Sequence, residues 1–506
     1  MKKKLLVLLL TFWSISSFAA EKSLSETIDS LFQPIVEFMA SILFWNPVTA
    51  LGFETDAQIP IVVVWLIIGA VFFTIRMKFV NIRAFKHGID LVRGKYSKND
   101  AKGEVSHFQA LATALSGTIG LGNIASVAVA ISIGGAGATF WMIIAGLLGM
   151  SLKFTECTLG VKYREIGSDG KVYGGPMYYL KKGLAKRGLP WIGKCLACIF
   201  ALIIFGASLG GGNMFQSNQA YSQLITIFPI LEGNGFWFGV IIALIVSIVI
   251  IGGIKGIAKV TSRVVPLMAG IYVIAALSII LINYDKIGAA FGMIWEGAFN
   301  PDSIKGGIIG VLILGFQRGA FSNEAGVGSA SIAHSAVKTK EPITEGIVAL
   351  LEPFIDTVIV CTMTALVIII TGFHNSNPQG FEGAQLTSAA FESVYSWFPY
   401  ILLIAILLFA FSTMITWAYY GLNGFHYVFN RFFKSQKALN YTFYVIFLTF
   451  TIIGASSSLK SVIDFSDMMI LSMAFPNILG LYFMAGEVKL DLENYLKKIK
   501  NKNKKN

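Results

Sequence analysis

Two glycine-dense segments of the chain carry polar side chains inside long apolar stretches. They are Ser116–Asn123 and Gly315–Ser329. Glycine lets a backbone leave the helix, and a carbonyl freed in apolar surroundings is costly unless an ion, a ligand or neighbouring protein pairs with it. Close helix packing through small residues would explain the glycines alone. It does not explain the amide and charged side chains beside them, so both segments are predicted to break a helix and bind a small polar solute or a cation.

The elements that hold these segments are predicted to be membrane-spanning helices. Hydrophobic residues make up 55% of the 506 residues, charged residues 13%, and the mean hydropathy is +0.69. A water-soluble domain carries about 25% charged residues. We therefore predict an all-α polytopic membrane protein with about eleven spans of helix-crossing length. The spans cover residues 60–77, 107–133, 138–160, 195–227, 236–253, 264–282, 304–333, 343–372, 399–428, 438–456 and 466–486.

The distribution of basic residues predicts the orientation of the spans. Most of the 40 lysine and arginine residues fall in alternate loops and in residues 487–506, whereas loops on the other side carry Lys22, Lys286, Lys305 and Lys460. Loops rich in lysine and arginine stay in the cytoplasm. The C-terminus is therefore expected to be cytoplasmic. The basic tail is expected to lie near anionic lipid, and no nucleic-acid partner is needed to explain the net charge of +12.

The N-terminus has the pattern of a secretory signal peptide. Residues 1–20 contain the basic stretch Lys2–Lys4, an apolar core and the small-residue ending Ala19–Ala20. An uncleaved anchor helix is the alternative interpretation. Residues 21–59 are expected to form an amphipathic segment on the outer side, and residues 60–106 an extra first helix with a basic cytoplasmic loop.

The two polar segments occupy matching positions in the series of spans. Residues 107–282 and residues 304–486 each contain five predicted spans, and each set opens with one of the predicted broken helices. The two sets cross the membrane in opposite directions. Such a 5+5 inverted repeat is typical of secondary transporters, for which the leucine transporter is a known example. There, half-helix N-termini face a substrate carboxylate while unwound carbonyls and hydroxyls coordinate a cation.

Several motifs resemble those of the alanine or glycine:cation symporter family, the sodium:alanine symporters. These motifs are Thr118–Asn123, Gly134–Ala138, Phe140–Met142, Gly174–Tyr179, Gly315–Gly326 and Thr416–Gly421. The resemblance covers roughly residues 60–490, and the Gly315–Gly326 motif is highly specific. It implies a leucine-transporter-like fold with one extra leading helix. It also implies sodium-driven uptake of alanine or glycine, which in a bacterium places the protein in the inner membrane.

A sodium site is expected between the first polar segment and the span 399–428. Sodium is a hard cation and prefers oxygen ligands. The candidates are backbone carbonyls near Ser116 and Ile119 together with the hydroxyls of Ser412 and Thr413. The alternative is that these hydroxyls bond back to their own helix.

The substrate carboxylate is expected at backbone amides of the first polar segment, and its ammonium at carbonyl or amide oxygens of the second. Trp417 and Phe316 are expected to cap the alanine methyl group, with ordinary packing as the alternative for both. The candidate substrate-binding residues are Gly117, Thr118, Gly120, Gly122, Asn123, Phe316, Gln317, Gly319 and Trp417.

Arg318 and Glu324 are charged side chains within a span, and such groups suggest function by default. Arg318 is expected to pair with Glu324, or with Glu352 or Asp356, which lie one turn apart on the span 343–372. The pair would be either structural or part of a cytoplasmic gate.

A proton is the alternative driving ion. A proton relay needs ionisable side chains in the core, and Glu352 and Asp356 keep this alternative open. None of the five histidines is expected to lie mid-span beside a carboxylate. Lys153 and Glu156 lie near the inner end of the span 138–160 and are expected to extend their charges toward the membrane surface.

Other classes of function remain as alternatives. They are a transporter of the same fold for another solute, a channel and a membrane sensor. A channel needs a continuous polar pore, whereas the two polar segments indicate a local site. The sequence has no metal-ligand cluster, no nucleophile–base pair and no phosphate-binding motif. We therefore expect no enzymatic activity and no organic cofactor, with sodium as the coupling ion.

Overall fold

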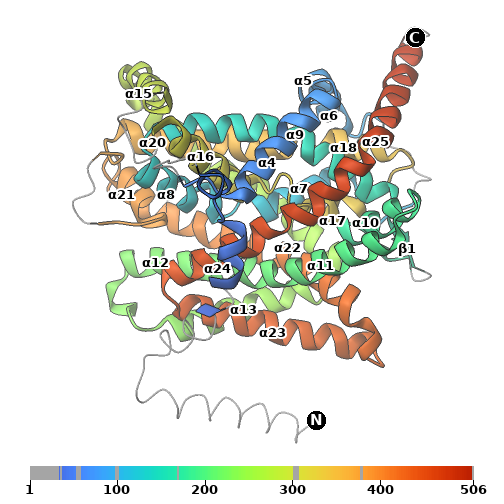
Figure 1. Cartoon of the computed structure of the whole chain (residues 1–506). Helices are drawn as coiled ribbons and strands as arrows, with labels where there is room; N and C mark the ends of the chain where they lie inside the picture. Colours follow the sequence, from blue (N-terminus) through green and yellow to red (C-terminus); the bar gives the residue numbers. More distant parts are fainter. Residues whose placement is uncertain are drawn as a thin grey trace, which may run out of the picture.

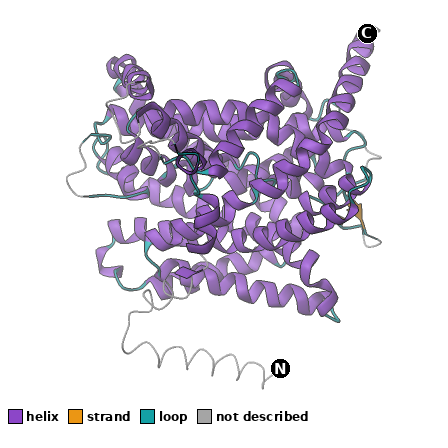
Figure 2. Cartoon of the chain, in the orientation of Figure 1, coloured by secondary structure: helices purple, strands orange, loops and turns teal. Residues whose placement is uncertain are grey.

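The computed structural model describes residues 33–34, 37–52, 58–96, 102–167, 170–299, 307–375 and 380–503. The predicted signal peptide, residues 1–20, lies outside the described residues. Within the described part the chain is helical apart from loops and one short antiparallel pair of strands, β1 (Glu165–Ile166) and β2 (Val172–Tyr173) (Figure 2). The predicted all-α class is confirmed.

Seven helical stretches in the described residues are long and apolar enough to cross a membrane. They are α9 (Gly137–Lys162), α11–α12 (Pro190–Ile227), α14 (Gly253–Ile282), α18–α20 (Pro342–Ile370), α22 with its last turn (Phe398–Phe432), α23 (Gln436–Ser456) and the stretch Leu459–Asn501 of α24 (Leu459–Ser472) and α25 (Ala474–Asn503). The pair α7 (His107–Thr118) and α8 (Ala125–Gly134) forms an eighth, bent span. Helices α4 (Ile61–Arg76), α13 (Gly235–Ile250) and α16 (Gly307–Asn323) are shorter, so the count of eleven spans stays a prediction.

Two of the long stretches contain a π-helical segment. Segment η2 (Gly210–Met214) joins α11 (Pro190–Leu209) to α12 (Phe215–Ile227). Segment η6 (Phe354–Cys361) joins α19 (Leu351–Pro353) to α20 (Thr362–Ile370). Such π-bulges are frequent at functional sites. Both of these segments lie against the candidate site described below.

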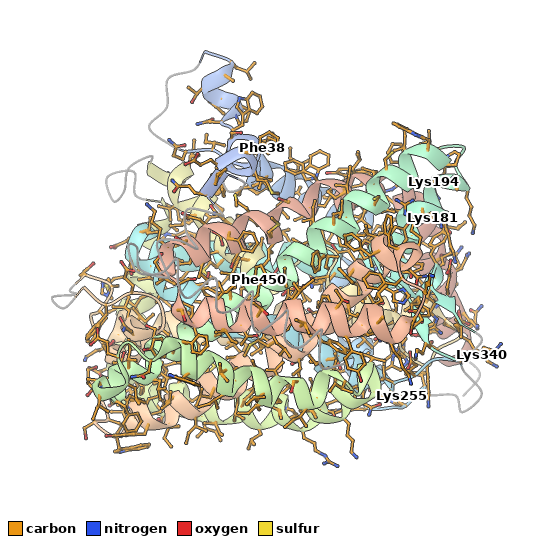
Figure 3. All side chains as sticks on the ribbon, turned by 90° about the horizontal axis from the view of Figure 1, so that it is seen from below. Phe38, Lys181, Lys194, Lys255, Lys340 and Phe450 are labelled. Atoms are coloured by element: carbon orange, nitrogen blue, oxygen red, sulfur yellow. The ribbon has the colours of Figure 1, made fainter. Side chains whose placement is uncertain are left out.

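The long helices run between two ends of the bundle that differ in charge. In Figure 1, α10 (Pro176–Ala185), β1 and α18 (Pro342–Ala349) mark one end, and α8, α12 and α21 (Ala384–Glu392) mark the other. Figure 3 shows that Lys181, Lys194, Lys255 and Lys340 gather at one end. These lysines belong to three loops that the sequence predicts on one side. We call this end the basic end, and the other the opposite end.

The predicted extra helix, α4, packs on the outside of the bundle. Its Trp65 indole nitrogen donates to the Ala474 carbonyl at 3.1 Å, and the Thr74 hydroxyl donates to the Leu148 carbonyl at 3.2 Å. Helix α4 therefore contacts α9 and α25.

The predicted basic tail is a continuation of α25 rather than a separate segment. Helix α25 runs on to Asn503 and projects from the bundle (Figure 1). Glu487 pairs with Lys162 at 2.6 Å and with Arg187 at 2.7 Å, while Lys78 pairs with Glu493 at 2.9 Å. These ion pairs attach the first part of the predicted tail to the basic end.

Two glycines of the second polar segment serve close packing of α16 on α9. A Cβ added at Gly315 would lie 2.5 Å from Trp141 Cβ and 2.8 Å from the Ala138 carbonyl oxygen. A Cβ at Gly319 would lie 3.0 Å from Ala145 Cβ. For these two glycines the small-residue packing interpretation holds.

Replacing Gly315 by alanine is expected to destabilise the protein. The added methyl group overlaps backbone and side chain of α9, which costs about 1–3 kcal/mol of the free energy of unfolding. The matched control is Gly270→Ala on α14, where an added Cβ meets no atom within 4 Å. Denaturation of both variants in detergent checks the prediction, and equal stability of G315A and G270A would contradict it.

Candidate functional site

The first polar segment breaks its helix as predicted. Helix α7 ends at Thr118, and Gly120 is extended, with φ −129° and ψ −151°. A single 3-10 turn, η1 (Leu121–Asn123), follows, and α8 then leaves at 57° to α7. All residues of the break are buried. The unwound backbone therefore lies inside the protein, away from lipid and water.

Two amide side chains satisfy the backbone N–H groups of this break. The Gly120 N–H donates to Asn123 Oδ1 at 3.1 Å, and the Leu121 N–H donates to Gln216 Oε1 at 3.2 Å. Gln216 is on α12 and donates in turn to the Gly211 carbonyl of the π-helical segment at 2.9 Å. The sequence reasoning missed Gln216, although a glutamine inside an apolar span was a visible signal.

The carbonyl groups at the end of α7 face helix α22. Thr413 Oγ1 donates to the Ser116 carbonyl at 2.9 Å, and Trp417 Nε1 donates to the Gly117 carbonyl at 3.2 Å. The Ser116 hydroxyl donates to the Ser412 carbonyl at 2.6 Å. The structure thus brings together Ser116, Ser412 and Thr413, which are three of the four residues predicted to bind sodium. Trp417 lies beside them.

The remaining predicted residues of this break have local partners. The Ser412 hydroxyl donates to the Phe409 carbonyl of its own helix at 3.1 Å, which is the back-bonding that competes with a role as sodium ligand. The Thr118 hydroxyl likewise reaches the Ala114 carbonyl at 3.4 Å. Ile119 is buried and is the C-cap residue that follows α7.

Asp356, in the π-helical segment η6, connects the two polar segments. Its Oδ2 accepts from Asn123 Nδ2 at 2.8 Å, and its Oδ1 accepts from the Ser322 hydroxyl at 2.8 Å and the Thr357 hydroxyl at 2.7 Å. The carboxylate is fully buried and receives neutral donors. Several hydrogen bonds can stabilise a buried carboxylate without a cationic neighbour.

Two threonines satisfy the carbonyl groups that follow the break. The Thr364 hydroxyl donates to the Asn123 carbonyl at 2.8 Å, and the Thr387 hydroxyl donates to the Ile124 carbonyl at 3.1 Å. Tyr272 on α14 shares a 2.6 Å hydrogen bond with Thr364. The break is therefore supported by hydrogen bonds from α12, η6, α20, α21 and α22.

The second polar segment also breaks its helix, but only in its second half. Helix α16 passes without interruption through Gly319 and ends at Asn323. The chain leaves the helix at Glu324, with φ +54°, and turns at Gly326 and Gly328, with φ +91° and +85°, before α17 (Ala330–Ser335). The glycines near Gly319 pack on α9, whereas the later glycines supply the left-handed backbone that a turn requires.

The position of this break limits the roles available to three predicted residues. Phe316 and Gln317 lie within α16, so their carbonyl groups are not freed by an unwound backbone. The Gln317 side chain points to Asp467 Oδ2 at 3.4 Å. Gly319 faces Ala145 of α9.

The two interrupted helices nevertheless touch at the candidate site. A Cβ added at Gly122 would lie 3.6 Å from Ser322 Cα and 3.9 Å from the Phe321 ring. Ser322 is two residues before the second break and also bonds Asp356. The first break and the end of α16 therefore form one contiguous polar region.

Arg318 pairs with Asp467 of α24 and not with Glu324, Glu352 or Asp356 as expected. Arg318 Nη2 lies 2.6 Å from Asp467 Oδ2, and Nη1 lies 3.2 Å from Oδ1. The pair is bidentate, and its side chains are only 9% and 5% exposed. Sequence reasoning did not single out Asp467, although it is a carboxylate within a predicted span.

The Arg318–Asp467 pair lies toward the opposite end of the bundle. It borders a cavity of about 10 Å³ that Gly383, beside α21, and Leu459, at the start of α24, also line (Figure 1). This volume admits about one water molecule. The pair therefore lies away from the basic end, and its role as a structural pair or as part of a gate stays a prediction.

The other predicted charges have partners of their own. Glu352 lies 3.1 Å from Lys153 Nζ, and Glu324 accepts from the Ser329 hydroxyl. Lys153 and Glu156 are both fully buried. The expectation that these two side chains reach the membrane surface is wrong, because other protein groups surround them.

The architecture is shared with a solved transporter. A crystal structure of MhsT in complex with L-phenylalanine superposes with a TM-score of 0.53 over 77% of this chain and 98% of that one, at 16% sequence identity. This likeness shows the fold alone. Taken with the broken helix and the membrane-length helices, it defines a multi-pass membrane protein of the leucine-transporter fold.

The family follows from the sequence comparisons. The model of the sodium:alanine symporter family matches residues 49–506, so the chain belongs to this family of symporters, which are not enzymes. The sodium/alanine symporter AgcS of Methanococcus maripaludis is 38% identical over 85% of this chain and 92% of its own length. The probable sodium/glutamine symporter GlnT of Bacillus subtilis is 31% identical over 87% and 88%.

Asp467→Asn is expected to destabilise the protein by leaving the Arg318 charge buried without a counter-charge. Breaking a buried ion pair on one side costs about 3–5 kcal/mol of the free energy of unfolding, and replacing both partners by apolar residues restores much of it. Denaturation in detergent of D467N, of the double variant R318M/D467L and of the exposed control D285N measures this. A D467N protein as stable as D285N would contradict the assignment.

Proposed function

We propose that this symporter imports a small neutral amino acid, alanine or glycine, together with sodium by alternating access. The single observation that carries the proposal is the buried break between α7 and α8, whose polar backbone faces α12, α22 and η6. The family match supports sodium coupling. The name of the 38% identical relative supports alanine, whereas the probable sodium/glutamine symporter is named for a larger solute.

Sodium is proposed to bind between α7 and α22. The ligands are the carbonyl oxygens of Ser116 and Ile119 and the hydroxyl oxygens of Ser412 and Thr413. A hydroxyl that donates its hydrogen to a carbonyl still has lone pairs for a cation. The 2.9 Å separation of Thr413 Oγ1 and the Ser116 carbonyl oxygen supports this position.

The amino acid is proposed to lie beside the first break. Its carboxylate meets the amide of Gly122 and the side chain of Asn123, because the Gly117 and Thr118 amides lie inside α7 and the Gly120 amide donates to Asn123 Oδ1. Trp417 limits the room for the substrate side chain, and its own hydrogen bond to the Gly117 carbonyl supports this placement. The side chains of Phe316 and Gln317 form the wall on the α16 side.

The moving unit is proposed to comprise α7–α9 and α16–α20. Asp356 joins η1, α16 and η6 within this unit, and the Lys153–Glu352 pair joins α9 to α19. Two other contacts, in contrast, join the unit to helices outside it. Ser116 of α7 accepts from Thr413 of α22, and Arg318 of α16 pairs with Asp467 of α24. Sodium at the α7–α22 boundary would therefore control the contact that must change when the unit rocks.

The basic end is proposed to face the cytoplasm of a bacterial cell, with the C-terminus on that side. The concentration of lysines at this end supports the orientation through the positive-inside rule (Figure 3). Opening of the Arg318–Asp467 pair would then admit solute from outside.

Thr413→Ala is expected to raise the sodium concentration for half-maximal alanine uptake about tenfold, equivalent to about 1.4 kcal/mol. The variant removes one sodium ligand and the hydrogen bond to the Ser116 carbonyl. The measurement is uptake of labelled alanine into proteoliposomes with an inward sodium gradient. Thr442→Ala is the matched control, because its exposed hydroxyl bonds only within α23.

Two results would overturn parts of this proposal. Wild-type uptake that ignores sodium and follows a pH gradient would favour the proton-coupled alternative. An unchanged sodium dependence in T413A would move the cation away from α22. A panel of competing amino acids in the same assay separates alanine from glycine and larger solutes.

A further inference from the structure

A cluster of ionisable side chains lies buried between the second break and the basic end. Six of its members are at most 2% exposed, and the seventh is 7% exposed. We call it the buried charge cluster, and it consists of Lys153, Glu156, Glu324, His334, Glu345, Glu352 and His107. It contains no residue of the proposed sodium or amino-acid site.

Two of the four carboxyl groups have cationic neighbours. Glu345 lies between His107 and His334, at 2.6 Å from His334 Nδ1. Glu352 lies 3.1 Å from Lys153 Nζ and 3.5 Å from His334 Nε2. Neither histidine lies mid-span, since His107 begins α7 and His334 lies in the short α17, but both face a carboxyl group because the chain folds α17 against α18 and α19.

The other two carboxyl groups form no ion pair with any described residue. Glu156 Oε1 accepts from Asn477 Nδ2 at 2.8 Å, while its Oε2 is buried and has no hydrogen-bond partner in the described part of the chain. Glu324 accepts from the Ser329 hydroxyl. A buried carboxylate without a counter-charge is unfavourable, and such a group takes up a proton instead.

Counting charges leads to the same conclusion for the whole cluster. With Lys153 and both histidines charged, three positive charges face four carboxyl groups. Among the neighbours, Asp356 adds a carboxyl group and the partly exposed Arg164 adds a positive charge near Glu345, so the excess of one carboxyl group persists. The cluster is therefore neutral only if at least one carboxyl group carries a proton.

Other ionisable groups facing the cluster do not change this balance. Cys157 on α9, Tyr179 on α10 and Tyr420 on α22 face its carboxyl groups, and all three are buried. A thiol and two phenols are neutral near pH 7 and add no positive charge.

We propose that Glu156 binds an exchangeable proton while the basic end is closed and releases it to solvent on that side when this end opens. Of the two carboxyl groups without an ion pair, Glu156 is the one with a buried oxygen that has no hydrogen-bond partner among the described residues. Its partner Asn477 also donates to the Gly326 carbonyl at 2.8 Å and accepts from the Tyr179 hydroxyl. Movement of the second break therefore changes the surroundings of Glu156 directly.

The direction of the pH effect follows from linkage. The closed state holds the proton and the hydrated open state does not, so lowering the pH favours the closed state. Acid on the side of the basic end should therefore slow transport, and acid on the other side should not. The inference rests on the alternating access proposed above but not on the identity of the amino acid.

The test is sodium-driven alanine uptake in oriented membrane vesicles, with the pH changed on each side separately. Lowering the pH on the basic side from about 8 to about 6 should reduce the initial rate about threefold or more in the wild type. Glu156→Gln, which imitates the protonated carboxyl group, should change less than about 1.5-fold over the same range. The exposed control Glu232→Gln should retain the wild-type profile.

Several outcomes would overturn the proposal. One is a wild-type pH profile in E156Q. Another is a flattened profile in Glu324→Gln alone, which would place the proton on Glu324. A third is a changed sodium requirement in E156Q, which would indicate a cation at Glu156. Absence of sodium-driven uptake in the wild type would instead refute the proposed function.

A second measurement does not depend on transport. The infrared spectrum of the purified protein should contain the carbonyl stretch of a protonated carboxyl group, and E156Q should lose intensity in this band. If E156Q is inactive, this spectrum decides the proposal. An unchanged band in E156Q would refute it.

Discussion

The structure depends on one constraint: polar backbone groups buried at membrane depth must be paired within the protein. The break between α7 and α8 removes regular helical hydrogen bonds at the most enclosed part of the bundle. Side chains of Asn123, Gln216 and Thr413 take the place of those bonds. Each comes from a different part of the chain, so the unwound backbone is stable only when the whole bundle has assembled. This cooperative arrangement keeps the site polar without opening it to lipid.

Asp356 shows that pairing of buried polar groups also holds neighbouring helices together. It accepts hydrogen bonds from Asn123 and Ser322 and so fixes the first break against the end of α16. Other buried contacts cross from the proposed moving unit to α22 and α24, and they include the Thr413–Ser116 hydrogen bond and the Arg318–Asp467 pair. A transporter needs both kinds, since one part must move as a body while the other contacts alternate.

The sequence predicted the elements of the site better than their partners. Glycine density and apolar context correctly predicted the break around Gly120, where an added Cβ would lie 2.5 Å from Thr413 Oγ1. The same signal did not locate the second break within its segment: Gly319 packs on α9, while Gly326 supplies the turn. Glycine serves both for close helix packing and for turns of the backbone. Only the position of the neighbouring helix shows which of the two roles a given glycine has. The partner of Arg318 could not be predicted either, because the distance between Arg318 and Asp467 depends on how α16 and α24 pack.

The most direct test of the central claim is a density map of the protein with sodium and alanine bound. The proposed arrangement predicts an extended backbone at Gly120, with density for the amino acid beside Gly117–Asn123 and for the ion between α7 and α22. A regular helix running through Gly120, or an amino acid bound away from this segment, would contradict it.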